Sequence, residues 1–425
     1  MIDINLIREK PEYVKEALKK KLWDVDFTEF LAWDARKREL IQIVENNKAE
    51  MNRLSASVPA AKKAGEDVSV IFKQVKEIAA KNTVFEEEKK QLDDKMREFL
   101  IALPNIPDDD LLGGGKENNK TIKVVGKKPE FSFKFKNHVE LAESLGLVDY
   151  ERGAKIAGHG AWVYTNLGAR LEWALLNFFI SEHLKDGYQF ILPPHLLNEE
   201  SGYVAGQFPK FREDVFWLEG LDPQRFLLPT AETALVNFHR NEILDESELP
   251  KKYFAYTPCY RREAGSYRTE ERGMIRGYQF DKVEMVQYTL PEDSDKAFEE
   301  LVNKAASLVE KLGLHFQISK LAAGDISHSM ARTYDIEVYL PSIGIYKEVS
   351  SASNARDYQA RRGMVRFKTK DGRKGYVHTL NASGLATSRI FPAILEQYQQ
   401  EDGSVLVPEV LQPFMGGIKA LKPIK

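Results

Sequence analysis

Two long stretches near the start of the chain repeat apolar residues in alternating steps of three and four. Lysine and asparagine occupy the few seam positions that are not apolar. The first seam runs Phe30, Trp33, Lys37, Leu40, Val44, Asn47, Met51, Leu54 and Val58, and the second runs Ile71, Val75, Ile78, Asn82, Phe85, Lys89, Leu92, Met96, Phe99 and Leu103. A break containing Pro59, Gly65 and Asp67 separates them. Heptad seams on either side of a break predict an antiparallel two-helix coiled-coil arm over about residues 27–103. A short helix is predicted before it, over Pro11–Lys21.

The seam also predicts which residues face each other across the arm. If the turn centres near residues 64–65, Asn47 lies opposite Asn82 and Val44 lies opposite Phe85. A facing pair of amides can hydrogen-bond and fix the register at some cost in stability. The alternative is that the two asparagines mark a wetter, frayed part of the seam.

The outer half of the predicted arm is locally basic. Between Lys48 and Lys81 there are seven basic and four acidic residues. Such charges usually form a solvated helix face. The sharper alternative is a phosphate-binding tip, with Arg53, Lys62, Lys63 and Lys73 as its candidate contacts.

Beyond the arm, the pattern changes to short strands mixed with amphipathic helices. Asn105–Asn119 is rich in Pro, Asp, Gly and Asn, as linkers are. We therefore predict an N-terminal domain over 1–104, a linker over 105–122 and a second domain over 123–425. No GxGxxG or GxxxxGK[ST] loop and no βαβ rhythm occurs, so a Rossmann or P-loop domain is not supported. The fold class expected is α+β, with an antiparallel sheet flanked by helices.

Composition narrows the class of protein. The chain has 425 residues, 43% hydrophobic and 29% charged, with a net charge of −3. A near-neutral chain binds nucleic acid only through a local basic patch. The single cysteine, Cys259, cannot form an internal disulfide, and the scattered histidines predict no zinc site. The N-terminus has no apolar signal core and no window has the length of a membrane span, so we expect a cytoplasmic protein without membrane contact.

The stretch over residues 257–286 carries the most chemical information. It has the pattern of a strand, a long polar loop and a second strand. Alternation places Phe280, Lys282 and Glu284 on one face, and Arg261 with Glu263 on one face. An arginine can bind an α-phosphate, a carboxylate can accept from an adenine amino group, and an aromatic ring can stack on the base. Periodicity alone leaves open an exposed hairpin with surface ion pairs.

This stretch resembles motif 2 of the class II aminoacyl-tRNA synthetases, in the form found in seryl-tRNA synthetases. Four further segments resemble that family in the same order: motif 1, the serine-binding loop, the ATP and metal segment, and motif 3. They are Tyr188–Leu197, Leu228–Glu232, Glu348–Asn354 and His378–Arg389. Together with the arm, the resemblance covers nearly the whole chain. It implies a serine–tRNA ligase that activates serine with ATP and transfers it to tRNA(Ser), and in this family commonly to tRNA(Sec).

The resemblance also implies roles for individual residues. Arg261 and Arg389 are the catalytic candidates. The expected ATP site is Arg261, Arg262, Glu263, Arg276, Phe280, Glu348, Val349, Ser350, Ser351 and Arg389. The expected serine site is Thr230, Ala231, Glu232, Arg261, Glu284, Asn381 and Ser383. Glu348 and Ser351 are the expected Mg²⁺ ligands. A homodimer, formed through motif 1, and an arm that contacts the long variable arm of the tRNA are implied in the same way.

Three positions depart from the usual family pattern. Ala382 stands where motif 3 usually has glycine, Gly277-Tyr278 replaces a polar residue and histidine, and Arg356 lies in a segment that differs from the common one. None removes an expected ligand. Two other functions remain open at this point: a class II relative that activates another small amino acid or loads a carrier protein, and a non-catalytic coiled-coil binding protein on the same fold.

Overall fold

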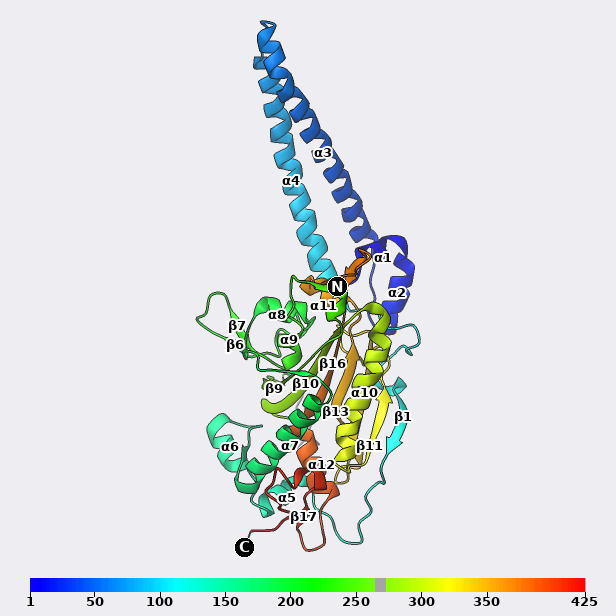
Figure 1. Ribbon diagram of the computed structural model, residues 1–425, viewed down its shortest axis with the longest axis vertical. Helices are drawn as coiled ribbons and strands as arrows, with labels where there is room; N and C mark the ends of the chain where they lie inside the picture. The colour runs from blue at the N-terminus through cyan, green and yellow to red at the C-terminus, as the bar shows by residue number, and fades with distance from the viewer. Residues whose placement is uncertain (264–272, 425) are drawn as a thin grey trace. The chain divides into compact units, whose positions relative to one another are not determined.

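The computed structural model describes residues 1–263 and 273–424, and its chain divides into two compact units (Figure 1). One unit consists of Ile2–Glu16 and Asp24–Leu103, and the other of Met1, Ala17–Trp23 and Pro104–Lys425. Part of the loop in the predicted motif 2, residues 264–272, lies outside the described residues. Within the described ranges, no helix combines the length and the apolar character needed to cross a bilayer.

The first unit is dominated by two long antiparallel helices, as the heptad seams predict. Helix α3 spans Thr28–Lys63 and α4 spans Ser69–Ala102. The Asn47 side-chain amide donates to Asn82 Oδ1 at 2.7 Å, which confirms the predicted register. Asn82 is buried, so the pair satisfies amide groups that burial alone would destabilise.

One expectation about the arm is wrong. Pro59 was expected to lie in the break between the seams, but α3 continues through it to Lys63. The turn occupies only the residues between Lys63 and Ser69. A proline costs a helix one hydrogen bond and some steric strain, and here the flanking alanines and lysines, all good helix formers, continue the helix beyond it.

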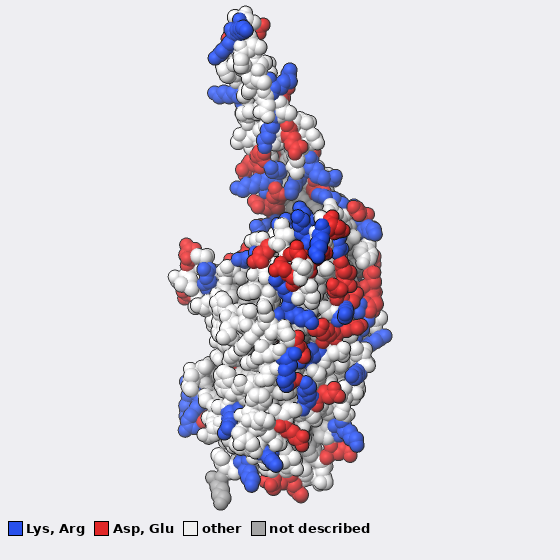
Figure 2. Space-filling view, in the orientation of Figure 1, with Lys and Arg blue, Asp and Glu red and all other residues white. Residues whose placement is uncertain are grey.

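Basic side chains outnumber acidic ones toward the end of the arm, although Glu66 and Asp67 lie in the turn itself (Figure 2). Arg53 is bound by Glu50 at 2.6 Å, and Lys48 by Glu86 at 3.2 Å. Lys62 and Lys63, in the last turn of α3, and Lys73 in α4 are exposed, and in the described part of the chain they form no ion pair. Their charge is therefore available to an external anion.

The second unit is built on an eight-stranded sheet. Its strand order is β1-β11-β12-β13-β16-β10-β9-β4, and the pairing is antiparallel except between β4 and β9. In that order the strands are Lys120–Val125, Phe316–Lys320, Arg332–Leu340, Ile345–Asn354, His378–Ala386, Gln279–Thr289, Lys251–Tyr260 and Gln189–Ile191. Helices α7 (Asn166–Lys185), α10 (Ser294–Lys311) and α12 (Thr387–Gln397) pack against the sheet and enclose the main hydrophobic core. The predicted α+β class is confirmed.

Shorter elements complete the chain. The remaining helices are α1 Ile4–Glu9, α2 Pro11–Lys20, α5 His138–Ser144, α6 Tyr150–Ala157, α8 Glu199–Val204, α9 Ala231–Leu235 and α11 Tyr358–Gly363. The remaining strands are β2 Val148–Asp149, β3 Val163–Tyr164, β5 Leu196–Asn198, β6 Trp217–Leu218, β7 Arg225–Leu227, β8 Ile243–Asp245, β14 Arg366–Lys368, β15 Lys374–Tyr376, β17 Val405–Leu406 and β18 Ala420–Leu421.

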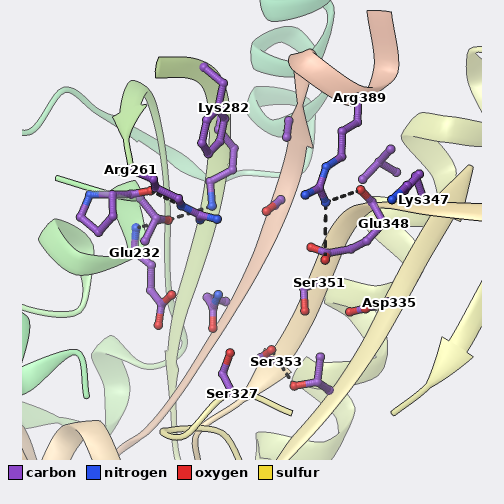
Figure 3. Close-up of a pocket in the computed structure, with 18 of the residues that line it drawn as sticks. Glu232, Arg261, Lys282, Ser327, Asp335, Lys347, Glu348, Ser351, Ser353 and Arg389 are labelled. Atoms are coloured by element: carbon purple, nitrogen blue, oxygen red, sulfur yellow. Dashed lines mark hydrogen bonds and ion pairs between the residues drawn. The ribbon is translucent and has the colours of Figure 1, made fainter. Parts of the chain in front are cut away.

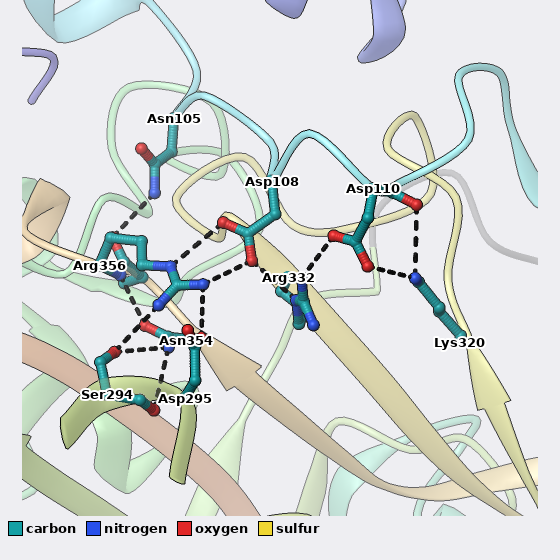
Figure 4. A network of polar contacts seen from close by, with 10 residues as sticks. Asn105, Asp108, Asp110, Ser294, Asp295, Lys320, Arg332, Asn354 and Arg356 are labelled. Carbon is teal, nitrogen blue, oxygen red and sulfur yellow. Dashed lines mark hydrogen bonds and ion pairs between the residues drawn. The ribbon is translucent and has the colours of Figure 1, made fainter. Parts of the chain in front are cut away.

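The segment that follows the arm, residues 104–119, is bound along the second unit, and we call it the strap (Figure 4). Asp108 pairs with Arg332 and Arg356, both at 2.7 Å. Asp110 pairs with Arg332 at 2.5 Å and with Lys320 at 2.6 Å. These ion pairs hold the strap against β11, β12 and the end of β13, so it is a fixed part of the unit.

Candidate active site

A cavity of about 770 Å³ lies in the second unit, over the strands β10, β13 and β16 (Figure 3). Thirteen of the residues expected at the site from the sequence line it. They are Thr230, Glu232, Arg261, Glu263, Arg276, Phe280, Glu284, Glu348, Val349, Ser351, Asn381, Ser383 and Arg389. The sheet brings these segments together because β16 pairs with β10 on one side and with β13 on the other.

Three expected site residues do not line the cavity. Ala231 is buried at the start of α9. Ser350 points away from the cavity, and its hydroxyl donates to the main-chain oxygen of Ser383 at 2.6 Å. Arg262 is exposed and donates to the main-chain oxygen of Glu213 at 3.2 Å. Ser350 lies within strand β13, where neighbouring residues point in opposite directions, so it faces away while Ser351 lines the cavity.

One end of the cavity is built around the buried carboxylate of Glu284. Asn381 Nδ2 and Ser383 Oγ donate to it at 3.1 and 3.2 Å. Lys282 Nζ lies 2.5 Å from Glu284 and also donates to the Thr230 hydroxyl at 2.8 Å. This cluster of a hydroxyl, an amide, an ammonium and a carboxylate can bind a small molecule that has both a hydroxyl and charged groups.

A second buried carboxylate, Glu232, lies in the same end of the cavity. Gln359 Nε2 donates to Glu232 Oε1 at 2.8 Å. Burial raises the pKa of Glu232 to about 7, and the neighbouring charge of Glu284 acts in the same direction. The Gln359 hydrogen bond and the charges of Lys282 and Arg261 oppose that rise. A carboxylate with this pKa gains from a bound cation, because the cation relieves both its burial and its repulsion by Glu284.

Three arginines and an aromatic ring line the rest of the cavity, and Arg261 is the arginine that lies beside Glu232 (Figure 3). The Arg261 guanidinium lies 5.1 Å from the centre of the Phe280 ring. Arg276 Nη1 donates to Glu263 Oε2 at 2.6 Å, and Arg389 Nη1 donates to the main-chain oxygen of Glu348 at 2.7 Å. Strand β9 ends at Tyr260, so Arg261 and Glu263 lie beyond the strand in which alternation was expected to place them. Both nevertheless line the cavity.

Oxygen atoms suited to a hard cation lie next to the arginines. Glu348 and Ser351 are on β13, and Asp335 on β12 is the register partner of Ser351. Asp335 Oδ1 is buried and has no hydrogen-bond partner among the described residues. Burial and the Glu348 charge raise the pKa of Asp335 well above its usual range. Mg²⁺ prefers oxygen ligands such as carboxylates and hydroxyls, so Glu348, Ser351 and Asp335 fit that ion. The described residues contain no group of three or more His, Cys, Asp or Glu that could hold a metal by themselves.

Several residues in or near the cavity have contacts that the sequence did not predict. Lys282 was placed on the face it occupies, but its two contacts with Thr230 and Glu284 were not foreseen. Gln359 lies on α11, and no pattern in the sequence points to it. Gly277 differs from the residue usual in the family, and packing explains the glycine, because a Cβ there would lie 2.2 Å from the Trp162 ring. Alternation with Phe280 and Glu284 was the one signal that could have identified Lys282.

Comparison with known proteins gives consistent matches over the two parts of the chain. Residues 1–107 match the family model described as seryl-tRNA synthetase N-terminal domain. Residues 216–398 match the model described as tRNA synthetase class II core domain (G, H, P, S and T).

Individual proteins match over the full length. Serine–tRNA ligase 2 from Clostridium acetobutylicum is 60% identical over 98% of this chain and 99% of its own. Serine–tRNA ligase from Thermodesulfovibrio yellowstonii is 44% identical over 98% and 99%. The crystal structure of seryl-tRNA synthetase from Pyrococcus horikoshii complexed with ATP superposes with a TM-score of 0.93, at 33% identity and full coverage of both chains.

The pKa of Glu232 generates a prediction about pH. Free serine remains predominantly an ammonium ion between pH 6 and 8, and the ionised form of Glu232 binds an ammonium better than the protonated form does. As the pH falls through about 7, Glu232 takes up a proton, so the KM for serine should rise about tenfold from pH 8 to pH 6. Steady-state kinetics of serine-dependent ATP–pyrophosphate exchange measures this. In Glu232→Gln the KM for serine should be higher than in the wild type and nearly independent of pH. If this variant showed the same pH dependence as the wild type, Glu232 would not be the group that titrates.

Proposed function

The chain belongs to the seryl-tRNA synthetase family and catalyses the ATP-dependent attachment of serine to tRNA, and we propose how its residues divide that work. The observation that carries the proposal is that one cavity contains a hydroxyl-accepting, ammonium-accepting end and an arginine-rich end. A small amino acid bound in the first end and a nucleoside triphosphate bound in the second would meet between Glu284 and Arg389.

Serine occupies the end formed by Thr230, Glu232, Glu284, Asn381 and Ser383. Its ammonium group lies against Glu232, and its hydroxyl donates to Glu284, whose remaining partners keep the carboxylate oriented. An amino acid without the hydroxyl would leave this buried carboxylate with an unmet acceptor, and such a loss discriminates strongly between substrates.

ATP occupies the other end. Phe280 stacks on the adenine, Glu263 accepts from its amino group, Arg261 binds the α-phosphate, and Arg276 and Arg389 bind the outer phosphates. Arg276 and Arg389 now contact Glu263 and Glu348, so nucleotide binding exchanges these partners for phosphate oxygens. Glu348 and Ser351 would hold a Mg²⁺ ion, which when bound supplies positive charge to the phosphates.

The reaction then needs position and charge rather than a protein nucleophile. The serine carboxylate oxygen attacks the α-phosphorus, the bond to the bridging oxygen of the β-phosphate breaks, and pyrophosphate leaves with that electron pair. Arg261 stabilises the charge that develops on the α-phosphate oxygens. In the second step a hydroxyl of the terminal tRNA ribose attacks the seryl carbonyl, and AMP leaves.

The assignment of the serine pocket predicts the behaviour of Glu284→Ala. Wild-type protein should show ATP–pyrophosphate exchange with serine and with no other amino acid. The variant should lose serine-dependent exchange by at least about 100-fold, since a charged hydrogen bond to the substrate is removed, while its affinity for ATP stays within about twofold. Equal loss of both would contradict the pocket assignment. Glu292→Ala, which removes an exposed carboxylate outside the cavity, is the matched control.

For the arm we propose contact with tRNA phosphates, through Lys62, Lys63 and Lys73, with Arg53 contributing once it leaves Glu50. Phosphate contacts position a nucleic acid without reading its bases. The substrate is tRNA(Ser), and from the resemblance we include tRNA(Sec). A cytoplasmic location follows from this role, because both tRNAs are used in translation there.

Replacement of Lys62, Lys63 and Lys73 by glutamine tests the role of the arm. The triple variant should keep serine-dependent exchange, while its KM for tRNA rises about tenfold or more. Charging of tRNA(Ser) and tRNA(Sec) in parallel, at two salt concentrations, measures this. A triple change at Lys10, Lys19 and Lys90, exposed lysines elsewhere in the chain, is the matched control. If charging by the two triple variants is the same, the tip does not bind tRNA.

We also propose that the protein is a homodimer formed over the edge of the sheet at β4. This edge strand has no neighbour on its outer side in the described chain. Exposed apolar side chains on α7 and around β4 accompany it: Trp173, Leu184, Phe190, Leu192 and Leu196. An unpaired strand edge beside exposed apolar residues is a surface that a partner chain covers.

Leu192→Glu tests the dimer. Leu192 is 73% exposed, so the change should not disturb the fold of the subunit, but it places a charge in the proposed interface. Sedimentation velocity should give the mass of two chains for the wild type and of one chain for the variant. Ile156→Glu, at a similarly exposed position on α6, should remain dimeric. A monomeric wild type would refute the proposal.

A further inference from the structure

The loop Ser327–Met330 forms part of the cavity wall and is held by two residues that are distant in the sequence. Ser327, Ser329 and Met330 line the cavity. Lys21 Nζ donates to the main-chain oxygens of Ser327, His328 and Met330 at 3.1, 3.2 and 2.6 Å. Together with Asn105, Lys21 therefore provides hydrogen bonds to every carbonyl of the loop.

Asn105 supplies the remaining contacts. Its main-chain N–H donates to the oxygen of His328 at 2.8 Å, and its side-chain amide donates to the oxygen of Ser329 at 3.0 Å. The same amide donates to the oxygen of Ala355 at 2.8 Å, just beyond β13. Asn105 is buried, so these bonds have little competition from water.

These two residues stand at the two ends of the arm in the sequence. Lys21 comes three residues before Asp24, where the main segment of the arm unit starts, and Asn105 comes two residues after Leu103, where it ends. Trp23, also in the second unit, lies edge-on to the His328 ring at 5.5 Å. The chain thus enters and leaves the arm through residues that bind one loop of the cavity.

Ion pairs of the strap hold Asn105 in position. Asp108 binds Arg332 and Arg356, and Arg356 also binds Asp295 on α10 at 2.7 Å (Figure 4). Arg356 lies in one of the segments that depart from the usual family pattern, and this network gives it a structural role. Farther along, Lys116 and Asn119 of the strap line the cavity themselves.

The loop supports the end of the cavity that binds serine. Ser329 packs so closely on Gly206 that a Cβ at residue 206 would lie 2.6 Å from the Ser329 Cβ. The next residue, Gln207, lines the cavity and accepts from the Thr233 hydroxyl on α9 at 2.9 Å. Helix α9 carries Glu232. A shift of the loop would therefore be transmitted to Glu232, at the serine end of the cavity.

We propose that Lys21 and Asn105 are positioning residues of the serine site, and that through them this site responds to tRNA bound by the arm. The inference rests on the proposed function of the arm and the cavity. Binding of tRNA strains or orders the two chain segments that lead out of the arm, and the loop Ser327–Met330 follows because all its carbonyls are attached there. By linkage, serine or its adenylate must then change the affinity for tRNA by the same factor.

Kinetics of the full-length enzyme test the positioning role. In Lys21→Met the three carbonyls lose a hydrogen-bond donor, and the KM for serine should rise about tenfold while the KM for ATP and kcat change less than about twofold. Lys21→Arg, which keeps charged donors, should restore part of the loss, and Asn105→Ala should act in the same direction as Lys21→Met. The matched control is Lys20→Met, since Lys20 donates only to the Asp109 oxygen of the strap, at 2.8 Å. Equal effects on serine and ATP, or the same effect in Lys20→Met, would overturn the positioning role.

Calorimetry tests the coupling. A sulfamoyl analogue of seryl-adenylate is titrated into each variant with and without tRNA(Ser), and the tRNA affinity is measured in the same preparations. The quantity compared is the ratio of the analogue Kd without tRNA to the analogue Kd with tRNA. We expect this ratio to differ from 1 by at least about threefold in the wild type and in Lys20→Met. It should approach 1 in Lys21→Met and Asn105→Ala. Suppose the wild type binds both tRNA and the analogue. The coupling is then refuted if the wild-type ratio is 1, or if Lys21→Met and Asn105→Ala keep the wild-type ratio. The proposed function stands in either case. If wild-type protein binds neither ligand, the proposed function itself fails.

Discussion

The antiparallel pairing of β16 with both β10 and β13 is the constraint on which the site depends. It places Glu284 opposite Ser383 and Ser353 opposite Asn381. Neighbouring strands lie about 4.8 Å apart, so backbone hydrogen bonds fix the spacing of side chains that come from three separate parts of the chain. Helices α7, α10 and α12 bury the sheet, which keeps that spacing rigid. The roles proposed for Glu284, Ser351 and Asn381 all follow from this pairing.

Several charged groups in the cavity are paired with one another. Glu284 is bound by Lys282, Glu263 by Arg276, and Glu348 lies beside Arg389. An unpaired charge in a half-buried cavity is costly, whereas a pair can be exchanged for substrate groups of the same charge at little net cost. Glu232 is not in such a pair: among the described residues the Gln359 amide donates to its carboxylate, and its pKa is near neutrality. In the proposed arrangement the serine ammonium group pairs with this carboxylate.

The arm and the cavity have different requirements, and the chain meets them with different kinds of contact. The arm needs stiffness and register, which a repeated apolar seam with one buried amide pair provides. The cavity wall needs a defined backbone, which Lys21, Asn105 and the ion pairs of the strap provide. Ion pairs and charged hydrogen bonds are directional, so they fix a loop more tightly than apolar packing does.

The sequence by itself determined whatever depends on local spacing. The heptad repeat predicted the arm and its register down to the Asn47–Asn82 pair, and the ordered motifs predicted the family and thirteen cavity residues. Tertiary structure decided the rest. Pro59 remains helical, Arg262 and Ser350 face away from the cavity, and Lys282 joins Thr230 to Glu284. The contacts of Lys21 and Asn105 with residues 327–330 join positions more than 200 residues apart in the sequence. No periodicity encodes such contacts, because they arise only when separately folded segments are packed against each other.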